Sequence, residues 1–348
     1  SLKGIDYAKK NNFSLIIALD CGIRAFNQVD YAKEKKVDFI ICDHHTPADK
    51  IPKAIAILNP KQRDCNYPYK ELSGCGVGFK LIQAYSQKNN IDFSEISEYL
   101  DLLTVSIGAD IVPMAGENRV FSYFGLKQIN THPRAGLKAL MDIANKRKEL
   151  SISDLVFGIA PRINAAGRIE HGKKAVEILV EQDLDRAKKL ASFIEENNVT
   201  RKNLDQDMTK EALEMIGENK KSTVVFSKNW HKGVVGIVAS RLIESHYKPT
   251  IVLAEKDNIL TGSARSVHDF DLYEAISKCA HLCEKFGGHK YAAGLSIKKE
   301  NLSEFIIAFE KVVSKSITED QLSPKIDVDM EIDIDAVDGK LFRIIKQF

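Results

Sequence analysis

The feature that most constrains this chain is a series of short apolar runs separated by segments with helical spacing. The runs cover residues 14–19, 37–42 and 54–58, and helical patterns cover residues 3–11 and 25–36. Strands without a polar face need helices on both sides of their sheet, which is typical of parallel sheets. The sequence therefore predicts an α/β domain with a parallel sheet that is covered on both faces.

Acidic and histidine residues directly follow these runs. Asp20 ends the first run, Asp43, His44 and His45 end the second, and Asp110 closes an apolar helical segment. Ligands of open parallel sheets bind at the carboxyl ends of the strands. Carboxylates combined with imidazoles suit manganese or magnesium. Asp20 alone could equally cap the next helix, but three such positions together favour a metal site.

A second α/β region follows a long charged segment, residues 173–217, that is predicted to be helical. Residues 222–226, 250–253 and 295–297 are predicted strands, and helices are expected near residues 271–283 and 301–315. A long charged helix between two such regions is typical of a connector between domains.

Two further segments have distinctive patterns. Residues 161–168 contain Pro161 and Gly167, which predicts a loop shaped by proline and glycine. Residues 326–335 alternate strictly between apolar and acidic side chains, which predicts a strand with one apolar and one acidic face. The acidic face is interpreted as solvated rather than as a second metal site.

Composition sets the remaining bounds. A chain of 348 residues predicts two or three domains. The net charge of +2, from 50 basic and 48 acidic residues, does not by itself indicate a nucleic-acid partner. The six cysteines form no Cys-x-x-Cys pair, and neither a secretory leader nor an apolar run of membrane-spanning length is found. These features predict a cytoplasmic protein with no membrane contact.

Several motifs, in a consistent order, resemble the DHH phosphoesterase superfamily. Those shared with the superfamily are residues 20–22 (DCG), 43–45 (DHH), 108–113 (GADIVP) and 287–294 (GGHKYAAG). Three more are similar to its RecJ-type exonucleases: residues 72–79 (LSGCGVGF), 161–168 (PRINAAGR) and 230–241 (WHKGVVGIVASR). The resemblance covers nearly the whole chain.

The resemblance implies a domain order. It implies a parallel-sheet DHH domain over residues 1–180 and a long connector helix over 181–218. It further implies a smaller α/β DHH-associated substrate-binding domain over 219–315 and the start of an OB-fold region over 316–348.

The resemblance also implies two divalent cations, Mn²⁺ or Mg²⁺, that activate water and hold the attacking and leaving oxygens. Asp20 would bridge the cations, and His44 and Asp110 would be ligands. His45 would contact the scissile phosphate, and Asp43 would orient a histidine from behind the ligands.

One family motif has no equivalent in this sequence. The family carries an Asp-rich segment on a strand ahead of the region that begins here, and this chain starts without Met and in mid-pattern. We therefore expect a trimmed chain with an incomplete two-metal site, which is inactive or severely impaired on its own.

The resemblance extends to residues that would bind nucleic acid. Ser263 and Arg265 would hold a 5′ phosphate, and Gly288 and His289 would contact the strand near the cleaved bond. Arg162, Asn164 and Arg168 would line a groove for the strand. The alternative is that the glycines form tight turns and the arginines are solvated.

The function implied is a 5′-to-3′ exonuclease specific for single-stranded DNA, acting in DNA repair and recombination. Expected partners are single-stranded DNA, a single-strand-binding protein and a RecQ-type helicase. One alternative is a phosphodiesterase for small substrates such as oligoribonucleotides, phosphoadenosine phosphate or cyclic dinucleotides. Another is a DNA-binding module without catalysis.

Overall fold

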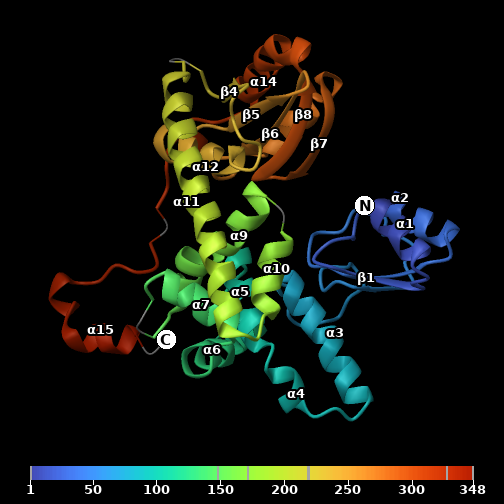
Figure 1. Ribbon diagram of the computed structural model, residues 1–348. Helices are drawn as coiled ribbons and strands as arrows, with labels where there is room; N and C mark the ends of the chain where they lie inside the picture. The colour runs from blue at the N-terminus through green and yellow to red at the C-terminus, as the bar shows by residue number, and fades with distance from the viewer. Residues whose placement is uncertain (1, 147–148, 171, 218–219, 327, 347–348) are drawn as a thin grey trace. The chain divides into compact units, whose positions relative to one another are not determined.

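The chain forms two compact units, Ser1–Arg201 and Lys202–Phe348. The structure, a computed structural model, describes residues 2–146, 149–170, 172–217, 220–326 and 328–346 (Figure 1). The division between the units falls inside the long helix α11 (Leu184–Glu214). No helix of the described residues is both long and apolar enough to cross a membrane.

Unit 1 opens with the predicted parallel sheet, which the structure confirms. Its strands are β1 (Leu15–Leu19), β2 (Asp38–Cys42) and β3 (Ala56–Leu58), in that order. Leu19 pairs with Cys42, which in turn pairs with Leu58, so the three carboxyl ends lie at one edge. Helices α1 (Leu2–Lys10) and α2 (Phe26–Glu34) pack together through buried Ile5 and Ala32.

The prediction that both faces of this sheet are covered is wrong for β1. Ile16 packs against the cluster formed by α1 and α2, whereas Leu15, Ile17 and Leu19 are 41–54% exposed. An uninterrupted apolar run does not reveal which of its two faces is covered, because side chains alternate along a strand.

The rest of unit 1 is helical. Its elements are α3 (Gly74–Lys88), α4 (Phe93–Ser97), α5 (Leu100–Asp110), α6 (Gly116–Thr131), α7 (Ala135–Ile143), α8 (Ile152–Asp154), a π-helical turn (Leu155–Ile159), α9 (Ala160–Ile169) and α10 (Lys173–Val180). Helix α5 is rich in buried apolar residues because it packs against α3 and α6.

Two helical expectations need correction. Residues 161–168 are not a loop but part of α9, where Pro161 lies in the first turn, just after the π-helical turn Leu155–Ile159. The helix expected over 173–217 is two helices, α10 and α11, separated at residues 181–183.

Unit 2 contains a five-stranded sheet in the order β4-β5-β6-β8-β7, in which only β4 and β5 are parallel. The strands are β4 (Thr223–Ser227), β5 (Thr250–Lys256), β6 (Ile259–Arg265), β7 (Cys283–His289) and β8 (Ala292–Lys298). The helices are α12 (Val235–His246), α13 (Leu272–Ser277) and α14 (Leu302–Ser316). Short 3-10 turns cover Ala280–Leu282, Lys299–Asn301, Asp320–Leu322 and Ile334–Ala336, and α15 spans Gly339–Ile345.

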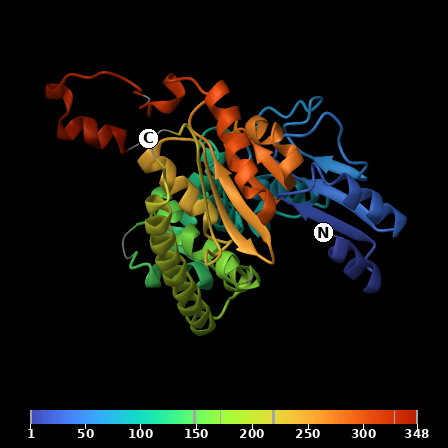
Figure 2. The same cartoon turned by 90° about the horizontal axis from the view of Figure 1, so that it is seen from above.

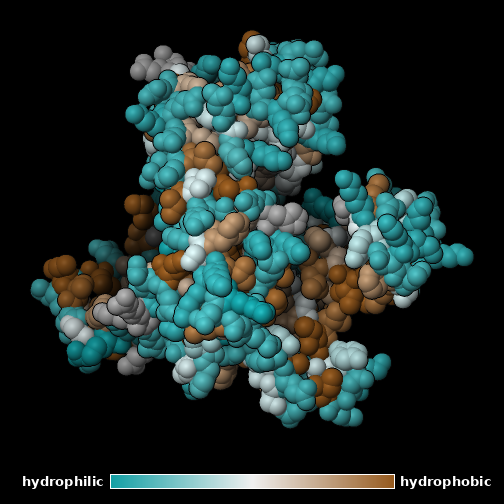
Figure 3. All heavy atoms as spheres, viewed as in Figure 1, coloured by the Kyte–Doolittle hydropathy of each residue, from teal (hydrophilic) through white to brown (hydrophobic). Residues whose placement is uncertain are grey.

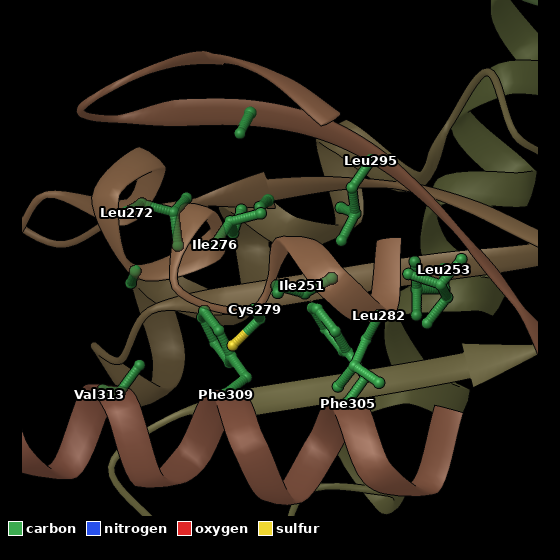
Figure 4. Packing of buried hydrophobic residues seen from close by; sticks show 14 of the residues in the cluster. Ile251, Leu253, Leu272, Ile276, Cys279, Leu282, Leu295, Phe305, Phe309 and Val313 are labelled. Carbon is green, nitrogen blue, oxygen red and sulfur yellow. The ribbon is translucent and has the colours of Figure 1, made fainter. Parts of the chain in front are cut away.

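The two faces of this sheet are covered differently. Helices α13 and α14 cover one face, where Phe305 and Phe309 pack on Ile251 and Leu295 (Figures 2 and 4). Helix α12 packs on β5 and β6 from the other face. This second face carries Ser263 and Arg265, which approach Gly236 in the first turn of α12.

The strand predicted over residues 326–335 is wrong for the residues that the structure describes. They form an irregular segment without strand partners, ending in a 3-10 turn at Ile334–Ala336, and Asp327 lies outside the described residues. Met330 is 72% exposed, and α15 also exposes apolar side chains, including Phe342 (Figure 3). Alternation creates a potential strand, but a strand forms only where a neighbouring edge pairs with it.

Candidate metal centre and nucleic-acid interface

His44 occupies the centre of a cluster at the carboxyl edge of the first sheet. It lies just beyond β2, and its ring Nδ1 is 3.0 Å from the carbonyl oxygen of Leu72. That contact directs Nε2 toward two carboxylates, 3.2 Å from Asp20 Oδ1 and 3.5 Å from Asp110 Oδ2. The structure thus brings together three residues that the sequence placed at separate element ends. We call Asp20, His44, His45 and Asp110 the sheet-edge cluster.

Asp20 has an unusual backbone and a close neighbour. Its φ of +61° lies in the left-handed region, which Asp tolerates better than most residues. Its N–H donates to Cys42 O at 2.9 Å, which ties the bend to the end of β2. A Cβ on Gly74, in the first turn of α3, would lie 2.6 Å from Asp20 Cβ and overlap the carboxylate. Glycine at position 74 therefore provides the space for the Asp20 side chain.

Asp43 is buried and acts as an acceptor behind the cluster. Its Oδ1 accepts the N–H of His44 at 2.8 Å and lies 2.7 Å from His45 Nδ1, and its Oδ2 accepts the N–H of Ile23 at 2.9 Å. A carboxylate at this distance favours the proton on His45 Nδ1, so that Nε2 is the ring atom available to other partners.

The pKa directions show that the cluster favours positive charge. The hydrogen bond to Asp20 raises the pKa of His44, although burial opposes it. Burial raises the pKa of Asp110, and nearby His44 only partly opposes this. Burial would also raise the pKa of Asp43, but hydrogen bonds from Ile23 and His45 hold it below its usual range. A proton on His44 Nε2 would face the carboxylates of Asp20 and Asp110, and a cation would be stabilised there in the same way.

The donor set fits a hard divalent cation. Asp20, His44 and His45 can each offer one ligand atom, and these atoms lie within 4.8 Å of one another. Asp110 adds another carboxylate oxygen beside His44. Two carboxylates combined with imidazole nitrogens suit Mn²⁺ or Mg²⁺ better than a thiolate-binding ion.

A second group of predicted residues lies on one face of the unit 2 sheet. Arg265 on β6 and His289 on β7 both pair in register with Ala292 on the strand between them. Cross-strand partners point to the same face and neighbouring strands are about 4.8 Å apart, so the two side chains lie roughly 10 Å apart on one face. Ser263 shares this face, and its Oγ accepts a hydrogen bond from Arg265 Nη1 at 2.7 Å.

The adjacent row of this face has almost no side chains. Ser263 pairs with Gly294, which pairs with Gly287. A Cβ on Gly287 would meet nothing within 4 Å, and one on Gly294 would meet only a backbone oxygen at 3.9 Å. Gly288 differs, because its φ is +151° and a Cβ there would lie 2.6 Å from Ala293 Cα. We call Gly287 and Gly294 the glycine floor, since packing requires a glycine at neither position.

The tight-turn alternative for these glycines is wrong. Gly262 and Ser263 belong to β6, and Gly287–His289 belong to β7, so they lie within strands of the sheet rather than in a turn. The backbone of a turn could form an anion nest, but here the backbone groups belong to β-ladders. Any ligand at this face would therefore meet side chains and a bare sheet surface.

The remaining predicted contacts lie on α9 in unit 1. Arg162 is largely buried, with Nε 2.6 Å from Glu195 Oε2 and Nη1 donating to Gly158 O at 2.6 Å. Asn164 and Arg168 are exposed on the same helix. The ion pair of Arg162 supports the packing of α9 against α11, while its part in binding nucleic acid stays a prediction.

Three positions that shape these sites have no role that their residue types alone would indicate. Leu72 and Gly74 occur in the motif at residues 72–79. Residue type alone does not reveal that the Leu72 carbonyl contacts His44 or that Gly74 lies close to Asp20. Gly294 was quoted with its motif, yet only the strand register shows that it lies beside Ser263.

Comparison with known proteins gives matches to two families. Residues 3–107 match the DHH family, N-terminal domain, and residues 219–315 match the DHHA1 domain. The single-stranded-DNA-specific exonuclease RecJ of Bacillus subtilis is 39% identical over 329 residues, which cover 92% of this chain and 41% of that protein.

Solved structures give the same result. RecJ from Thermus thermophilus in complex with Mn²⁺ has a TM-score of 0.82 and 28% identity, covering 90% of this chain and 47% of that chain. The complex of RecJ from the same organism with Mg²⁺ has a TM-score of 0.73 and 26% identity, with the same coverage. The chain thus spans less than half the length of these three relatives.

Proposed function

Because this chain belongs to the DHH family and carries a DHHA1 domain, we propose that it is the nuclease core of a RecJ-type exonuclease specific for single-stranded DNA. The observation that carries the proposal is the convergence of His44 Nε2 on Asp20 and Asp110 at the carboxyl edge of a parallel sheet. The similarity to RecJ proteins supports the choice of substrate.

We propose that Asp20, His44 and Asp110 hold Mn²⁺ or Mg²⁺. Such cations supply a nucleophile at neutral pH and stabilise the charge of phosphodiester hydrolysis. The Leu72 carbonyl orients His44, and Asp43 holds His45 through its Nδ1. In its imidazolium form, His45 can then donate from Nε2 to a phosphate oxygen as negative charge develops there. Asp43 therefore positions His45, and His45 stabilises the negative charge that develops on the phosphate.

The unit 2 face provides a surface for the DNA strand. Arg265 and Ser263 present a guanidinium and a hydroxyl that can bind a terminal phosphate, and His289 stands two strands away. The glycine floor lets a sugar-phosphate chain lie directly on the sheet. Capture of a 5′ phosphate here supports 5′-to-3′ digestion.

The biological setting is part of the same proposal. We infer a role in DNA repair and recombination in the cytoplasm, beside a single-strand-binding protein and a RecQ-type helicase. The 348 residues alone are expected to cleave slowly or not at all, because Asp20, His44 and Asp110 are fewer donors than two six-coordinate cations require.

The experiment that tests the function compares substrates at a high protein concentration with Mn²⁺. We expect slow release of mononucleotides from the 5′ end of a long 5′-phosphorylated single strand, and none from a blunt duplex. Cleavage of dinucleotides without attack on the long strand would instead identify a small-substrate phosphodiesterase. Rapid digestion would contradict the expected impairment but not the function. Failure to bind or cleave any single strand would contradict the function itself.

The glycine floor makes a separate prediction. Changing Gly294 to alanine should lower the affinity for a single-stranded oligonucleotide about tenfold, because the methyl group occupies the surface on which the strand lies. The free energy of unfolding should stay equal or rise by about 0.4–1 kcal/mol, since alanine restricts the unfolded chain. Fluorescence anisotropy and urea unfolding measure the two effects.

Gly288→Ala provides the contrast for the unfolding measurement alone, since Gly288 is itself predicted to contact the strand. Its backbone conformation and the contact with Ala293 should make it destabilising. Wild-type affinity in Gly294→Ala would show that the strand does not lie on this floor.

A further inference from the structure

Ile111 adopts a backbone conformation that disfavours its side chain. It follows the last residue of α5, at φ +55° and ψ +37°, in the left-handed region. Glycine or asparagine usually occupies this place after a helix, because a branched Cβ collides with the backbone there. A β-branched residue at this position therefore costs stability.

Packing of the Ile111 side chain does not offset this loss of stability. Ile111 is 80% exposed, the same high value as the fully solvated tail residue Ile334. The next residue, Val112, packs into the core beside α3 and α5. The left-handed bend thus turns Val112 inward and Ile111 outward, which explains the conformation but not the choice of isoleucine.

The position of Ile111 suggests what the side chain does. It is bonded directly to Asp110, whose carboxylate lies 3.5 Å from His44 Nε2. Its neighbour Met114 is also exposed, so apolar side chains lie next to a cluster of charged and polar groups. Strained residues collect at functional sites when a ligand uses them, and Asp20, which also approaches His44 Nε2, is likewise left-handed.

We propose that Ile111 is a substrate-binding residue that packs on the base or sugar of the nucleotide next to the scissile phosphate. This rests on the proposed function. An aliphatic side chain has neither charge nor hydrogen-bonding groups, so it can contact only the apolar faces of the nucleotide. Such a contact does not distinguish one base from another.

Two variants separate binding from strain. Ile111→Asn removes the apolar side chain and tolerates the left-handed backbone, whereas Ile111→Ala removes the side chain but keeps an unfavourable Cβ. Each is compared with the wild-type chain for its urea unfolding midpoint. Each is also compared for its affinity for a 5′-phosphorylated dT oligonucleotide and for an oligomer of equal length made only of abasic sugar phosphates, with Mn²⁺ present.

The expected result has three parts. Both variants bind the dT oligonucleotide roughly fivefold to tenfold more weakly than the wild type, as for the loss of one base contact. Their affinity for the abasic oligomer changes less if Ile111 packs on the base, and falls equally if it packs on the sugar. Ile111→Asn unfolds at a higher urea concentration than the wild type, whereas Ile111→Ala does not.

Other outcomes overturn the inference. Unchanged affinity for both oligomers in both variants would show that the side chain does not contact substrate. A lower unfolding midpoint for Ile111→Asn would show that the isoleucine stabilises the free protein. If the wild-type chain binds neither oligomer, the proposed function fails, and this inference fails with it.

Discussion

Replacing His44 with alanine is expected to weaken Mn²⁺ binding by more than about a hundredfold, beyond the usual effect of losing an outer-shell contact. The reason is geometric, because His44 Nε2 is the only nitrogen that lies within 3.5 Å of both Asp20 and Asp110 among the described residues. Isothermal titration calorimetry with MnCl₂ measures the change directly. Any Mn²⁺-dependent nuclease activity should be lost together with the binding.

His132 offers the matched control for this substitution. It is an exposed histidine in the same unit, at the C-terminal end of α6, and it does not belong to the sheet-edge cluster. His132→Ala should bind Mn²⁺ as the wild type does. Equal Mn²⁺ affinity in His44→Ala and His132→Ala would contradict the assignment of His44 as a ligand.

The second large effect is expected from Gly74→Ala. The added Cβ would overlap Oδ1, Cγ and Cβ of Asp20, so the carboxylate must leave its place beside His44. We expect Mn²⁺ affinity to fall about tenfold to a hundredfold, the range typical of lost support for a ligand. The fold should persist, because the nearest obstructing atoms belong to the exposed Asp20 side chain and alanine favours the helix.

Gly78→Ala tests the same helix without touching the cluster. A Cβ at position 78 would lie 3.3 Å from Leu19 Cδ2, the end of a half-exposed side chain that can move aside. Its Mn²⁺ affinity should match the wild type. If Gly74→Ala also keeps wild-type Mn²⁺ affinity, the space beside Gly74 is not needed to place the Asp20 carboxylate next to His44. Global unfolding in Gly74→Ala would place the role of this glycine in folding instead.

The residues of the sheet-edge cluster that follow directly after strands could be predicted from the sequence. Asp20 and His44 each follow an apolar run, and parallel strands place their carboxyl ends at one edge. Asp110 could be expected only as the end of an apolar helix. Its approach to His44 depends on how α5 packs against α3, which residue patterns do not encode locally.

Other features depended on tertiary context. Residues 326–335 have an ideal strand pattern but no edge to pair with in the described residues, whereas residues 161–168 form a helix despite containing Pro161 and Gly167. The faces of β6 and β7 could not be deduced either. The row that joins Arg265 and His289 through Ala292 arises from antiparallel register, and a shift of one residue would turn either side chain to the opposite face.

The central claim is that Asp20, His44 and Asp110 hold a divalent cation at this sheet edge, and diffraction from crystals soaked in MnCl₂ tests it most directly. We predict an anomalous manganese peak about 2.0–2.3 Å from His44 Nε2 and from a carboxylate oxygen of Asp20 and of Asp110. A manganese peak bound elsewhere, or full soaking with no peak beside His44, would contradict it.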